Sequence, residues 1–391
     1  MKTLSILGST GSIGRNCLRV IEEFPDDFRV TGLAAGSNTV LLAEQIKRFR
    51  PQIVSVSGPT AKEALSQRLQ HLPHSHRPKI MTELEGMTAV ATHPEADLVV
   101  SAIVGVQGLL PTFAAIECGK TIALANKEIM VVAGELVTAA AKRNQVLILP
   151  VDSEHNAIHQ CLRAGRREEV KRVILTASGG PFRSYSPAML ESVTPAMALN
   201  HPTWRMGHRV TVDSATMMNK GFEVLEAKWL FDLPIDRISV LVHPQSTVHS
   251  MVEYHDGSVI AQMGVTDMRH PIQYALTYPE RLASPRPSLD FGDVQKLEFM
   301  QPDLDQFPCL ELAYQAARNL GAQPCALNAA DEVAVQHFLT GGIQFLTIPR
   351  IVRQMLANCG TQSNFSTVSE LLQYDKCVRE ETKQLIERDY R

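Results

Sequence analysis

Residues 1–150 repeat one hydrophobic pattern: a short apolar run, a turn, and then a stretch with apolar residues at helical spacing, as at 12–24 and 40–49. The apolar runs lie at 3–7, 29–34, 53–56, 98–103, 122–124 and 146–151. Continuous apolar runs separated by helices are typical of a parallel, doubly wound sheet. The pattern therefore predicts an α/β, Rossmann-like domain over residues 1–150.

The pattern changes after residue 150. Strand-like runs at 172–176, 238–242, 247–254 and 258–263 bracket a helical segment at 215–231, and Asp256-Gly257 is a hairpin signal. We expect a central α+β catalytic domain at 151–285, with a partly antiparallel sheet. A linker rich in proline and aspartate at 286–308 then leads to a helical bundle at 309–391.

Composition narrows the classes of function. The 391 residues carry a net charge of −3, which gives no electrostatic footprint for nucleic acid or an anionic membrane. The seven cysteines are scattered singly, as in reduced cytoplasmic proteins. We expect no targeting segment. The most apolar stretch, 97–116, is interrupted by glycine and proline, so no membrane span is predicted.

A glycine-rich turn, Gly8-Ser9-Thr10-Gly11-Ser12-Ile13-Gly14, joins the first predicted strand to the first helix. Glycines let the backbone approach a pyrophosphate, and the helix N-terminus supplies N–H donors and a positive dipole. The GxxGxxG spacing is associated with NADP-binding proteins. The alternative is a glycine-rich turn without a ligand.

The end of the second predicted strand indicates which nicotinamide is bound. An NAD site places an acid there to bind the ribose 2′-hydroxyl, whereas this strand ends Ala34-Ala35-Gly36-Ser37-Asn38. Ser37 and Asn38 can donate to a 2′-phosphate that a carboxylate would repel. We therefore expect NADPH.

Two acids follow the last run of the first domain. If the strand continues, Asp152 and Glu154 project to one face, at the edge of the sheet where α/β folds bind ligands. Adjacent carboxylates need protons or a cation, and oxygen ligands without cysteine favour Mg²⁺ or Mn²⁺. The alternative interpretation is a helix cap.

A second cluster runs from a strand-like segment beginning at Asp213 into a helix. Ser214, Asn219 and Lys220 offer hydroxyl, amide and ammonium donors to a phosphate, and Glu223 shares their helix face as a third metal oxygen. The alternative is a surface ion pair between Lys220 and Glu223. Glu226 is interpreted as an exposed helix carboxylate.

Three shorter motifs complete the candidate site. Ser178-Gly179-Gly180 offers a second phosphate contact after a strand. Trp204 lies in the aperiodic segment 201–207 and is either a hydrophobic plug or part of a lid. Lys127 begins a helix, where it caps the helix, forms an ion pair or faces the substrate.

These motifs, in this order, resemble those of the 1-deoxy-D-xylulose 5-phosphate reductoisomerase family over almost the whole chain. The matching blocks are GSTGSIG, LANKE, PVDSEH, SGGPFR, HPTWRMG, DSATMMNKGFEVLEA, HPQS, DGS, DMRHPI and LNAADEVAV. The resemblance implies a homodimer that converts 1-deoxy-D-xylulose 5-phosphate to 2-C-methyl-D-erythritol 4-phosphate by rearrangement and NADPH reduction, in non-mevalonate isoprenoid biosynthesis. It implies a divalent metal, Mg²⁺ or Mn²⁺, with Co²⁺ as a further candidate.

The resemblance also assigns roles to residues. Asp152, Glu154 and Glu223 hold the metal, while Lys127 and Ser153 contact the reacting oxygens. The phosphate is bound by Ser178, Ser214, Asn219 and Lys220, the lid carries His201, Trp204 and Met206, and activity depends on His155 and His243. The NADPH site is assigned to Gly8, Thr10, Gly11, Ser12, Ile13, Gly36, Ser37, Asn38, Asn126, Glu128 and Gly207, with Met268 nearby.

The chain departs from the family pattern at three positions. Ile129 stands where a small hydroxyl residue is expected, Ser37 where a basic residue is common, and Asp331 where asparagine is usual. None belongs to the metal or phosphate set. Two rival functions are a plain NADP-dependent dehydrogenase without an isomerase step and a non-catalytic nucleotide sensor.

Overall fold

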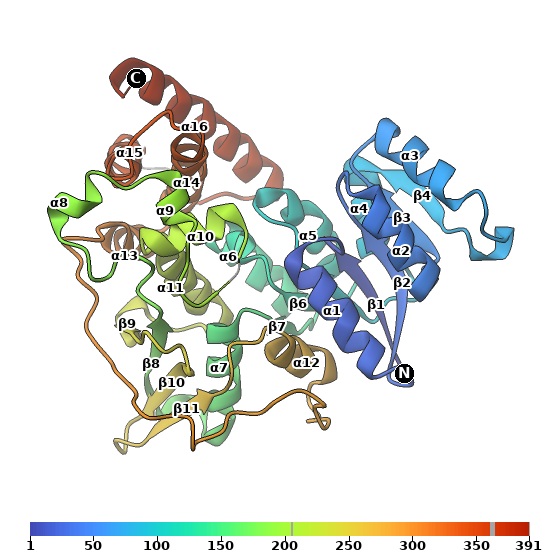
Figure 1. Cartoon of the computed structure of the whole chain (residues 1–391), viewed down its shortest axis with the longest axis horizontal. Helices are drawn as coiled ribbons and strands as arrows, with labels where there is room; N and C mark the ends of the chain where they lie inside the picture. Colours follow the sequence, from blue (N-terminus) through green and yellow to red (C-terminus); the bar gives the residue numbers. More distant parts are fainter. Residues whose placement is uncertain (205, 360–363, 391) are drawn as a thin grey trace. The chain divides into compact units, whose positions relative to one another are not determined.

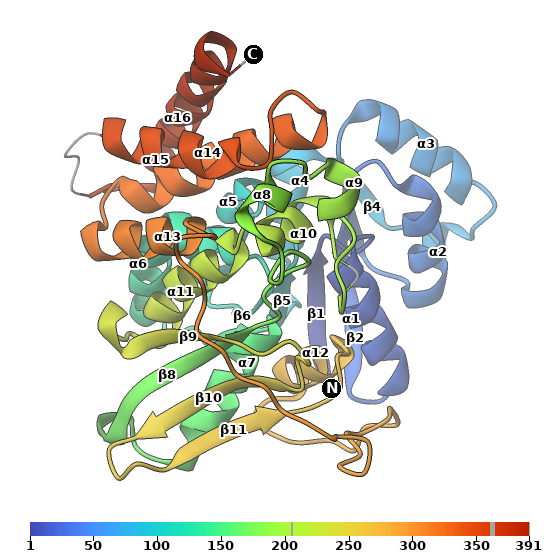
Figure 2. The same cartoon turned by 60° about the vertical axis from the view of Figure 1, so that its left-hand side comes forward.

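The computed structural model describes residues 1–204, 206–359 and 364–390. The chain divides into two compact units that interleave along the sequence (Figures 1 and 2). Unit 1 comprises Met1–Ile129, Val137–Asn156 and Asp267–Arg286, and unit 2 comprises Met130–Leu136, Ala157–Thr266 and Pro287–Arg391. The three-domain division with a linker at 286–308 stays a prediction.

Unit 1 is built on a seven-stranded parallel sheet with the order β4-β3-β2-β1-β5-β6-β7. Its strands are β1 (Lys2–Leu7), β2 (Phe28–Ala34), β3 (Ile53–Val56), β4 (Lys79–Thr82), β5 (Leu98–Ser101), β6 (Thr121–Leu124) and β7 (Ile148–Pro150). The predicted doubly wound α/β sheet is confirmed. The strand order reverses between β1 and β5, the switch point at which such sheets bind ligands.

The helices of unit 1 alternate with these strands. They are α1 (Ser12–Glu23), α2 (Thr39–Phe49), α3 (Pro59–Leu69), α4 (Glu83–Ala91), α5 (Leu109–Glu117) and α12 (Arg269–Thr277), while α6 (Lys127–Arg143) and α7 (Ser153–Cys161) have residues in both units. Although α12 comes late in the chain, it packs beside α1 (Figure 1). Ile272 and Leu276 of α12 join the apolar core formed by β1, α1 and α2.

The sequence analysis missed strand β4. Lys79–Thr82 contributes no fully buried side chain, because Lys79 is exposed and the other three residues are only partly covered. The strand lies at the outer edge of the sheet, where one neighbour suffices. A short edge strand therefore lacks the apolar run on which the prediction depended.

Unit 2 contains a four-stranded mixed sheet with the order β11-β10-β8-β9. Its strands are β8 (Val170–Ala177), β9 (Ile238–Val242), β10 (Val248–Tyr254) and β11 (Val259–Met263). Strand β8 pairs parallel with β9 and antiparallel with β10, and β10 forms a hairpin with β11 around Asp256-Gly257 (Figure 2). The predicted partly antiparallel sheet and its hairpin are confirmed.

The remaining helices belong to unit 2. They are α8 (Pro187–Leu190), α9 (Pro195–Ala198), α10 (His208–Ala215), α11 (Met218–Leu230), α13 (Cys309–Asn319), α14 (Gln323–Leu339), α15 (Thr347–Asn358) and α16 (Val368–Asp389). Helices α13–α16 confirm the predicted C-terminal helical bundle. The prediction of a strand-like segment entering one helix at 215 is wrong, because residues 208–215 form a separate helix, α10.

Candidate active site

The glycine turn after β1 requires glycine at two positions. Gly8 has a φ of +88°, and a Cβ there would lie 2.4 Å from the carbonyl oxygen of Ala102. A Cβ at Gly14 would lie 2.3 Å from the carbonyl oxygen of Gly8. Gly11 precedes α1 without a side chain to cap it, so the first N–H groups of the helix are donors for an anion.

The segment after β2 is exposed at Gly36, Ser37 and Asn38. Asn38 caps α2, because its Oδ1 accepts a hydrogen bond of 3.2 Å from the backbone N–H of Leu41. The side-chain donors that this segment offers are then the amide nitrogen of Asn38 and the hydroxyl of Ser37. Their assignment to the nucleotide stays a prediction.

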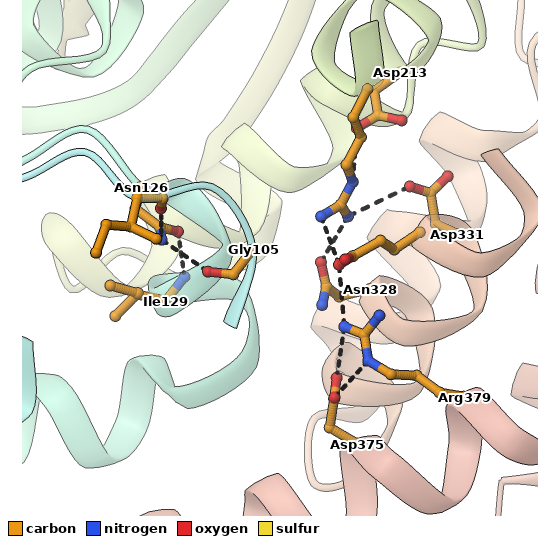
Figure 3. A network of polar contacts seen from close by, with 11 residues as sticks. Gly105, Asn126, Ile129, Asp213, Asn328, Asp331, Asp375 and Arg379 are labelled. Carbon is orange, nitrogen blue, oxygen red and sulfur yellow. Dashed lines mark hydrogen bonds and ion pairs between the residues drawn. The ribbon is translucent and has the colours of Figure 1, made fainter. Parts of the chain in front are cut away.

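Asn126 lies between β6 and α6 and is only 3 % exposed. Its Nδ2 donates to the carbonyl oxygen of Gly105 at 2.8 Å and also to that of Ile103, while its Oδ1 accepts from the backbone N–H of Ile129 at 3.2 Å (Figure 3). The side chain thus fixes the loop after β5 to the start of α6. Glu128 lies in the first turn of the same helix and is 6 % exposed.

Asp152, Ser153 and Glu154 mark the start of α7. Strand β7 ends at Pro150 and the helix begins at Ser153, so the predicted continuation of the strand through Glu154 is wrong. The helical interpretation holds for the backbone, because the carbonyl oxygen of Asp152 accepts from the N–H of Asn156 at 2.8 Å. Asp152 and Glu154 therefore emerge from a helix start rather than from one face of a strand.

The side chains at this helix start are mostly buried and charged. Lys127 Nζ lies 2.6 Å from Asp152 Oδ2, and the two side chains are 11 % and 17 % exposed. Ser153 Oγ donates to Glu154 Oε2 at 2.6 Å. Of the roles considered for Lys127, the ion pair is the one observed.

Asn156 is a residue that the sequence analysis did not single out. It is 1 % exposed, and its Nδ2 donates to the carbonyl oxygens of Pro150 at 2.8 Å and Pro271 at 3.1 Å. The amide therefore ties the start of α7 to the end of β7 and to α12. The spacing of four residues between Asp152 and Asn156 was the only sequence signal for this role. The contact with Pro271 could not be predicted, because that residue is remote in the sequence.

In unit 2, Glu223 lies in a second cluster of polar side chains on α11. Asn219 Nδ2 donates to Glu223 Oε1 at 2.7 Å, and Lys220 Nζ forms an ion pair with Glu223 Oε2. The side chains of Lys220 and Glu223 are 5 % and 1 % exposed, so the ion pair exists but is not a surface pair. Met217, just before this helix, has a φ of +63°. Residues other than glycine rarely adopt this backbone conformation, and those that do are often found at functional sites.

The interpretation of Glu226 as an exposed carboxylate is wrong. Its exposed fraction is 0 %, equal to that of Glu223 one turn earlier. Only Lys228 and the last residues of α11 are clearly more exposed, because the helix is enclosed from its first turn through Ala227. Glu226 is therefore unsuitable as a surface control for Glu223.

Ser178 and its glycines lie at the end of β8, against the helix that carries Ser214. Gly179 and Gly180 have φ values of +80° and +69°, and a Cβ at Gly180 would lie 2.5 Å from the carbonyl oxygen of Ser214. Ser178 Oγ accepts from the N–H of Gly180 at 3.2 Å and lies 3.0 Å from His201 Nε2. The structure thus brings Ser178, Ser214 and His201 into one region of unit 2.

His201 is held in one tautomer. Its Nδ1 accepts from the backbone N–H groups of Thr203 at 3.2 Å and Trp204 at 2.9 Å, so the ring proton lies on Nε2 and points at Ser178 Oγ. Burial, and then the charge of Arg183, lowers the pKa of His201, which favours this neutral form. With two donors directed at its oxygen, the hydroxyl of Ser178 can donate its own proton to an anion.

The predicted lid segment is partly covered. Trp204 and Met206 are both of intermediate exposure, and the Trp204 ring centroid lies 6.5 Å from that of His249. Gly207 directly precedes α10 and is exposed. Arg205 lies outside the described residues. Trp204 is therefore not a fully buried plug, and its role as a lid stays a prediction.

The two histidines that the sequence resemblance links to activity are both fully buried. His155 lies on α7 with an exposed fraction of 0 %. His243 follows β9; its Nε2 accepts from the N–H groups of Thr247 at 3.2 Å and Val248 at 3.1 Å, and its Nδ1 lies 2.8 Å from the carbonyl oxygen of Glu298. His243 therefore donates from Nδ1 and joins the turn after β9 to residue 298.

These features define an α/β protein with a dinucleotide-type turn and buried carboxylate–ammonium clusters, the class that includes nicotinamide-dependent oxidoreductases. Comparison with known proteins identifies the family. The 1-deoxy-D-xylulose 5-phosphate reductoisomerase model matches residues 4–134, that enzyme's C-terminal domain model matches 148–231, and the DXP reductoisomerase C-terminal domain model matches 263–381. The chain belongs to the 1-deoxy-D-xylulose 5-phosphate reductoisomerase family and is an enzyme of that family.

Individual relatives match over nearly their full length. The 1-deoxy-D-xylulose 5-phosphate reductoisomerase of Solibacter usitatus is 50 % identical over 98 % of this chain and 97 % of its own, and that of Desulforamulus reducens is 51 % identical over 99 % of both. A solved structure from Zymomonas mobilis in complex with NADPH is 41 % identical over 99 % of both chains, with a TM-score of 0.92. A solved complex with NADPH, fosmidomycin and magnesium is 40 % identical over 99 % of this chain and 98 % of its own, with a TM-score of 0.93.

Proposed function

We propose that this enzyme converts 1-deoxy-D-xylulose 5-phosphate to 2-C-methyl-D-erythritol 4-phosphate, with NADPH and a divalent metal, in non-mevalonate isoprenoid biosynthesis. The observation that carries the proposal is the match to reductoisomerases of about half-identical sequence along the whole chain. The buried acids and donors described above supply the chemistry that this reaction requires. Two solved relatives contain NADPH, and one of these also contains magnesium.

Asp152, Glu154 and Glu223 are the proposed metal ligands. All three offer carboxylate oxygens, the donors that Mg²⁺ and Mn²⁺ prefer, and Co²⁺ is a further candidate. Asp152 pairs with Lys127, and Glu223 pairs with Lys220, so each of these two carboxylates lies beside an ammonium group. A bound cation supplies Lewis acidity toward the carbonyl and hydroxyl oxygens of the substrate.

Four donors are proposed for the phosphate group. Lys220 supplies a buried positive charge, Asn219 an amide, and Ser178 and Ser214 hydroxyl groups. The Oγ of Ser214 donates to the carbonyl oxygen of Val210 at 2.8 Å and can turn toward an anion. Charge-assisted hydrogen bonds of this kind orient the substrate as well as bind it.

Lys127 and Ser153 are proposed to contact the reacting oxygens. The ammonium of Lys127 would stabilise negative charge that develops on those oxygens, an effect strengthened by its mostly buried position. The 201–207 segment, with His201, Trp204 and Met206, would cover the substrate and exclude water. NADPH, held by the glycine turn and the segment after β2, supplies the hydride.

The test is NADPH oxidation by the purified protein with 1-deoxy-D-xylulose 5-phosphate, with and without Mg²⁺, Mn²⁺ or Co²⁺, followed by absorbance and product NMR. We expect metal-dependent oxidation and a branched product skeleton. Reduction without rearrangement would favour a plain dehydrogenase. NADPH binding without turnover under any metal condition would favour a nucleotide sensor.

We also propose a cytoplasmic homodimer. Strand β11 forms one end of the four-stranded sheet in the described part of the chain, and Val259 and Ile260 on it are 49 % and 38 % exposed. Pairing of two such edges would satisfy the exposed backbone N–H and C=O groups of β11 and would bring these apolar side chains beside their counterparts. Light scattering should report twice the monomer mass, and Ile260→Lys should reduce that mass. The cytoplasmic location is supported by the seven free cysteines.

A further inference from the structure

Arg209 lies near the start of α10, and its side chain is only 11 % exposed. Its Nη1 lies 2.8 Å from Glu332 Oε2, and its Nη2 donates to Asn328 Oδ1 at 2.8 Å. The same Nη2 lies 3.6 Å from Asp331 Oδ2. One guanidinium therefore contacts three polar side chains within two turns of α14.

Arg209 also contacts the two helices that carry the proposed phosphate donors. Its Nε lies 3.5 Å from Oδ2 of Asp213, which is on its own helix next to Ser214. Its guanidinium carbon lies 5.6 Å from the ring centroid of Phe222 on α11, within cation–π range. Arg209 is thus at the meeting point of α10, α11 and α14.

The network continues to the C-terminal helix. Arg379 Nη2 lies 3.0 Å from Glu332 Oε2, and Arg379 Nε lies 2.6 Å from Asp375 Oδ2. Figure 3 shows Asp213 at the top of the network, Asn328 and Asp331 below it, and Arg379 and Asp375 at its lower end. The chain of charges therefore links α16 to α14 and α14 to α10.

The acidic side chains around Arg209 outnumber the positive charge that they share. The side chains of Asp213, Asp331 and Glu332 all lie within 3.6 Å of the guanidinium of Arg209. Asp331 is completely buried, and burial raises the pKa of its carboxyl group against the opposing charge of Arg209. Apolar side chains could join these helices without the cost of burying charges. The network is therefore better explained as a device that fixes the relative orientation of the helices than as a source of folding stability.

We propose that Arg209 is a positioning residue for phosphate binding. It fixes α10 and α11 against α14, so that Ser214 on α10 and the Asn219–Lys220 pair on α11 address the same anion. The two helices are joined only through Thr216 and the strained Met217, so their relative orientation depends on contacts such as these. The proposal rests on the phosphate role assigned to Ser214, Asn219 and Lys220 under the proposed function.

The test compares Arg209→Met, Arg209→Lys and Glu332→Gln with the full-length parent. Arg318→Met is the matched control, because Arg318 on α13 forms an exposed ion pair of 3.1 Å with Glu311. Binding of fosmidomycin with NADPH and Mg²⁺, and of inorganic phosphate alone, is measured by calorimetry. The KM for 1-deoxy-D-xylulose 5-phosphate, kcat and the Kd for NADPH complete the set.

We expect Arg209→Met to weaken fosmidomycin and phosphate binding and to raise the substrate KM by roughly tenfold or more, because a misplaced Ser214 or Lys220 would lose at least one charge-assisted hydrogen bond to the anion. The Kd for NADPH should be unchanged, Arg209→Lys should recover part of the loss, and Glu332→Gln should show a smaller loss of the same kind. Arg318→Met should match the parent. Glu332→Gln keeps the proposal testable if Arg209→Met does not fold.

Unchanged phosphate and fosmidomycin affinity in folded Arg209→Met would overturn the proposal. So would an equal loss of NADPH and phosphate binding, since that indicates general damage. Failure of the proposed function is separate: the parent would then not turn over the substrate, whereas the phosphate calorimetry still tests Arg209.

Discussion

Replacing Asp331 by asparagine should change how the stability of unit 2 depends on pH. Asp331 is 0 % exposed, and burial raises its pKa from 3.8 to about 6, opposed by the charge of Arg209 and a hydrogen bond with Asp213. The folded protein thus holds this proton to a higher pH than the unfolded chain does. The stabilisation from protonated Asp331 is complete below about pH 3.8 and is lost as pH rises through about 6.

The size of the effect follows from the shift. At about 1.4 kcal/mol per pKa unit, the full change in the free energy of unfolding is about 3 kcal/mol, of which roughly half falls between about pH 5 and pH 8. Asparagine has nearly the same shape and does not titrate. From pH 5 to pH 8, the stability of Asp331→Asn relative to the parent should therefore rise by between about 1 and 2 kcal/mol.

The assay is equilibrium urea unfolding followed by tryptophan fluorescence. Both tryptophans, Trp204 and Trp229, lie in unit 2 with Asp331, so the signal reports the correct unit. Asp232→Asn is the control, since the Asp232 side chain is 96 % exposed. Parallel pH profiles for the parent and Asp331→Asn would refute the reasoning, because they would show that Asp331 does not exchange its proton between the folded and unfolded states in this range.

Three further predictions concern catalysis. Because no acid follows β2, kcat/KM should be clearly higher with NADPH than with NADH. Equal values for the two cofactors would contradict the assignment of a 2′-phosphate site to this segment. Trp204→Ala should reduce turnover far more than the melting temperature; lost stability with activity preserved would make Trp204 a packing residue. Asp152→Asn, Glu154→Gln and Glu223→Gln should each keep NADPH binding but lose metal-dependent turnover by a large factor, while Asp232→Asn matches the parent; activity and metal affinity unchanged in Glu223→Gln would exclude it as a ligand.

The sequence predicted the elements whose formation depends on local periodicity. Six of the seven strands in unit 1 coincide with apolar runs, because a strand covered on both faces must be apolar along its length. The turn at Gly8 was equally clear from its glycine spacing. The structure gives the reason for that glycine, because Ala102 leaves no room for a side chain. The glycine at 257 marked the β10–β11 hairpin for a related reason, its φ of +88°.

Other features depend on contacts that periodicity does not encode. The segment at Asp213 was interpreted as strand-like, yet residues 208–215 form a helix in which Arg209 and Asp213 face the same side at a spacing of four. Glu226 seemed exposed because a lone glutamate on a helix is exposed in most proteins, whereas α11 is enclosed through Ala227. In both cases tertiary packing, rather than local preference, decided the outcome.

The Arg209 network shows why a positioning residue is harder to predict than a ligand. The proposed metal ligands and phosphate donors were selected by residue type and by spacing within one motif, as with Asn219, Lys220 and Glu223. Arg209, by contrast, acts through Asn328, Asp331 and Glu332, more than a hundred residues away along the chain. The departure from the family pattern at Asp331 was visible in the sequence. Its physical consequence, however, depends on the guanidinium of Arg209 beside it. An acid at this position adds a buried group that titrates, whereas asparagine would supply only an amide. A single substitution away from the metal and phosphate residues can therefore alter the pH dependence of the region without changing any proposed catalytic residue.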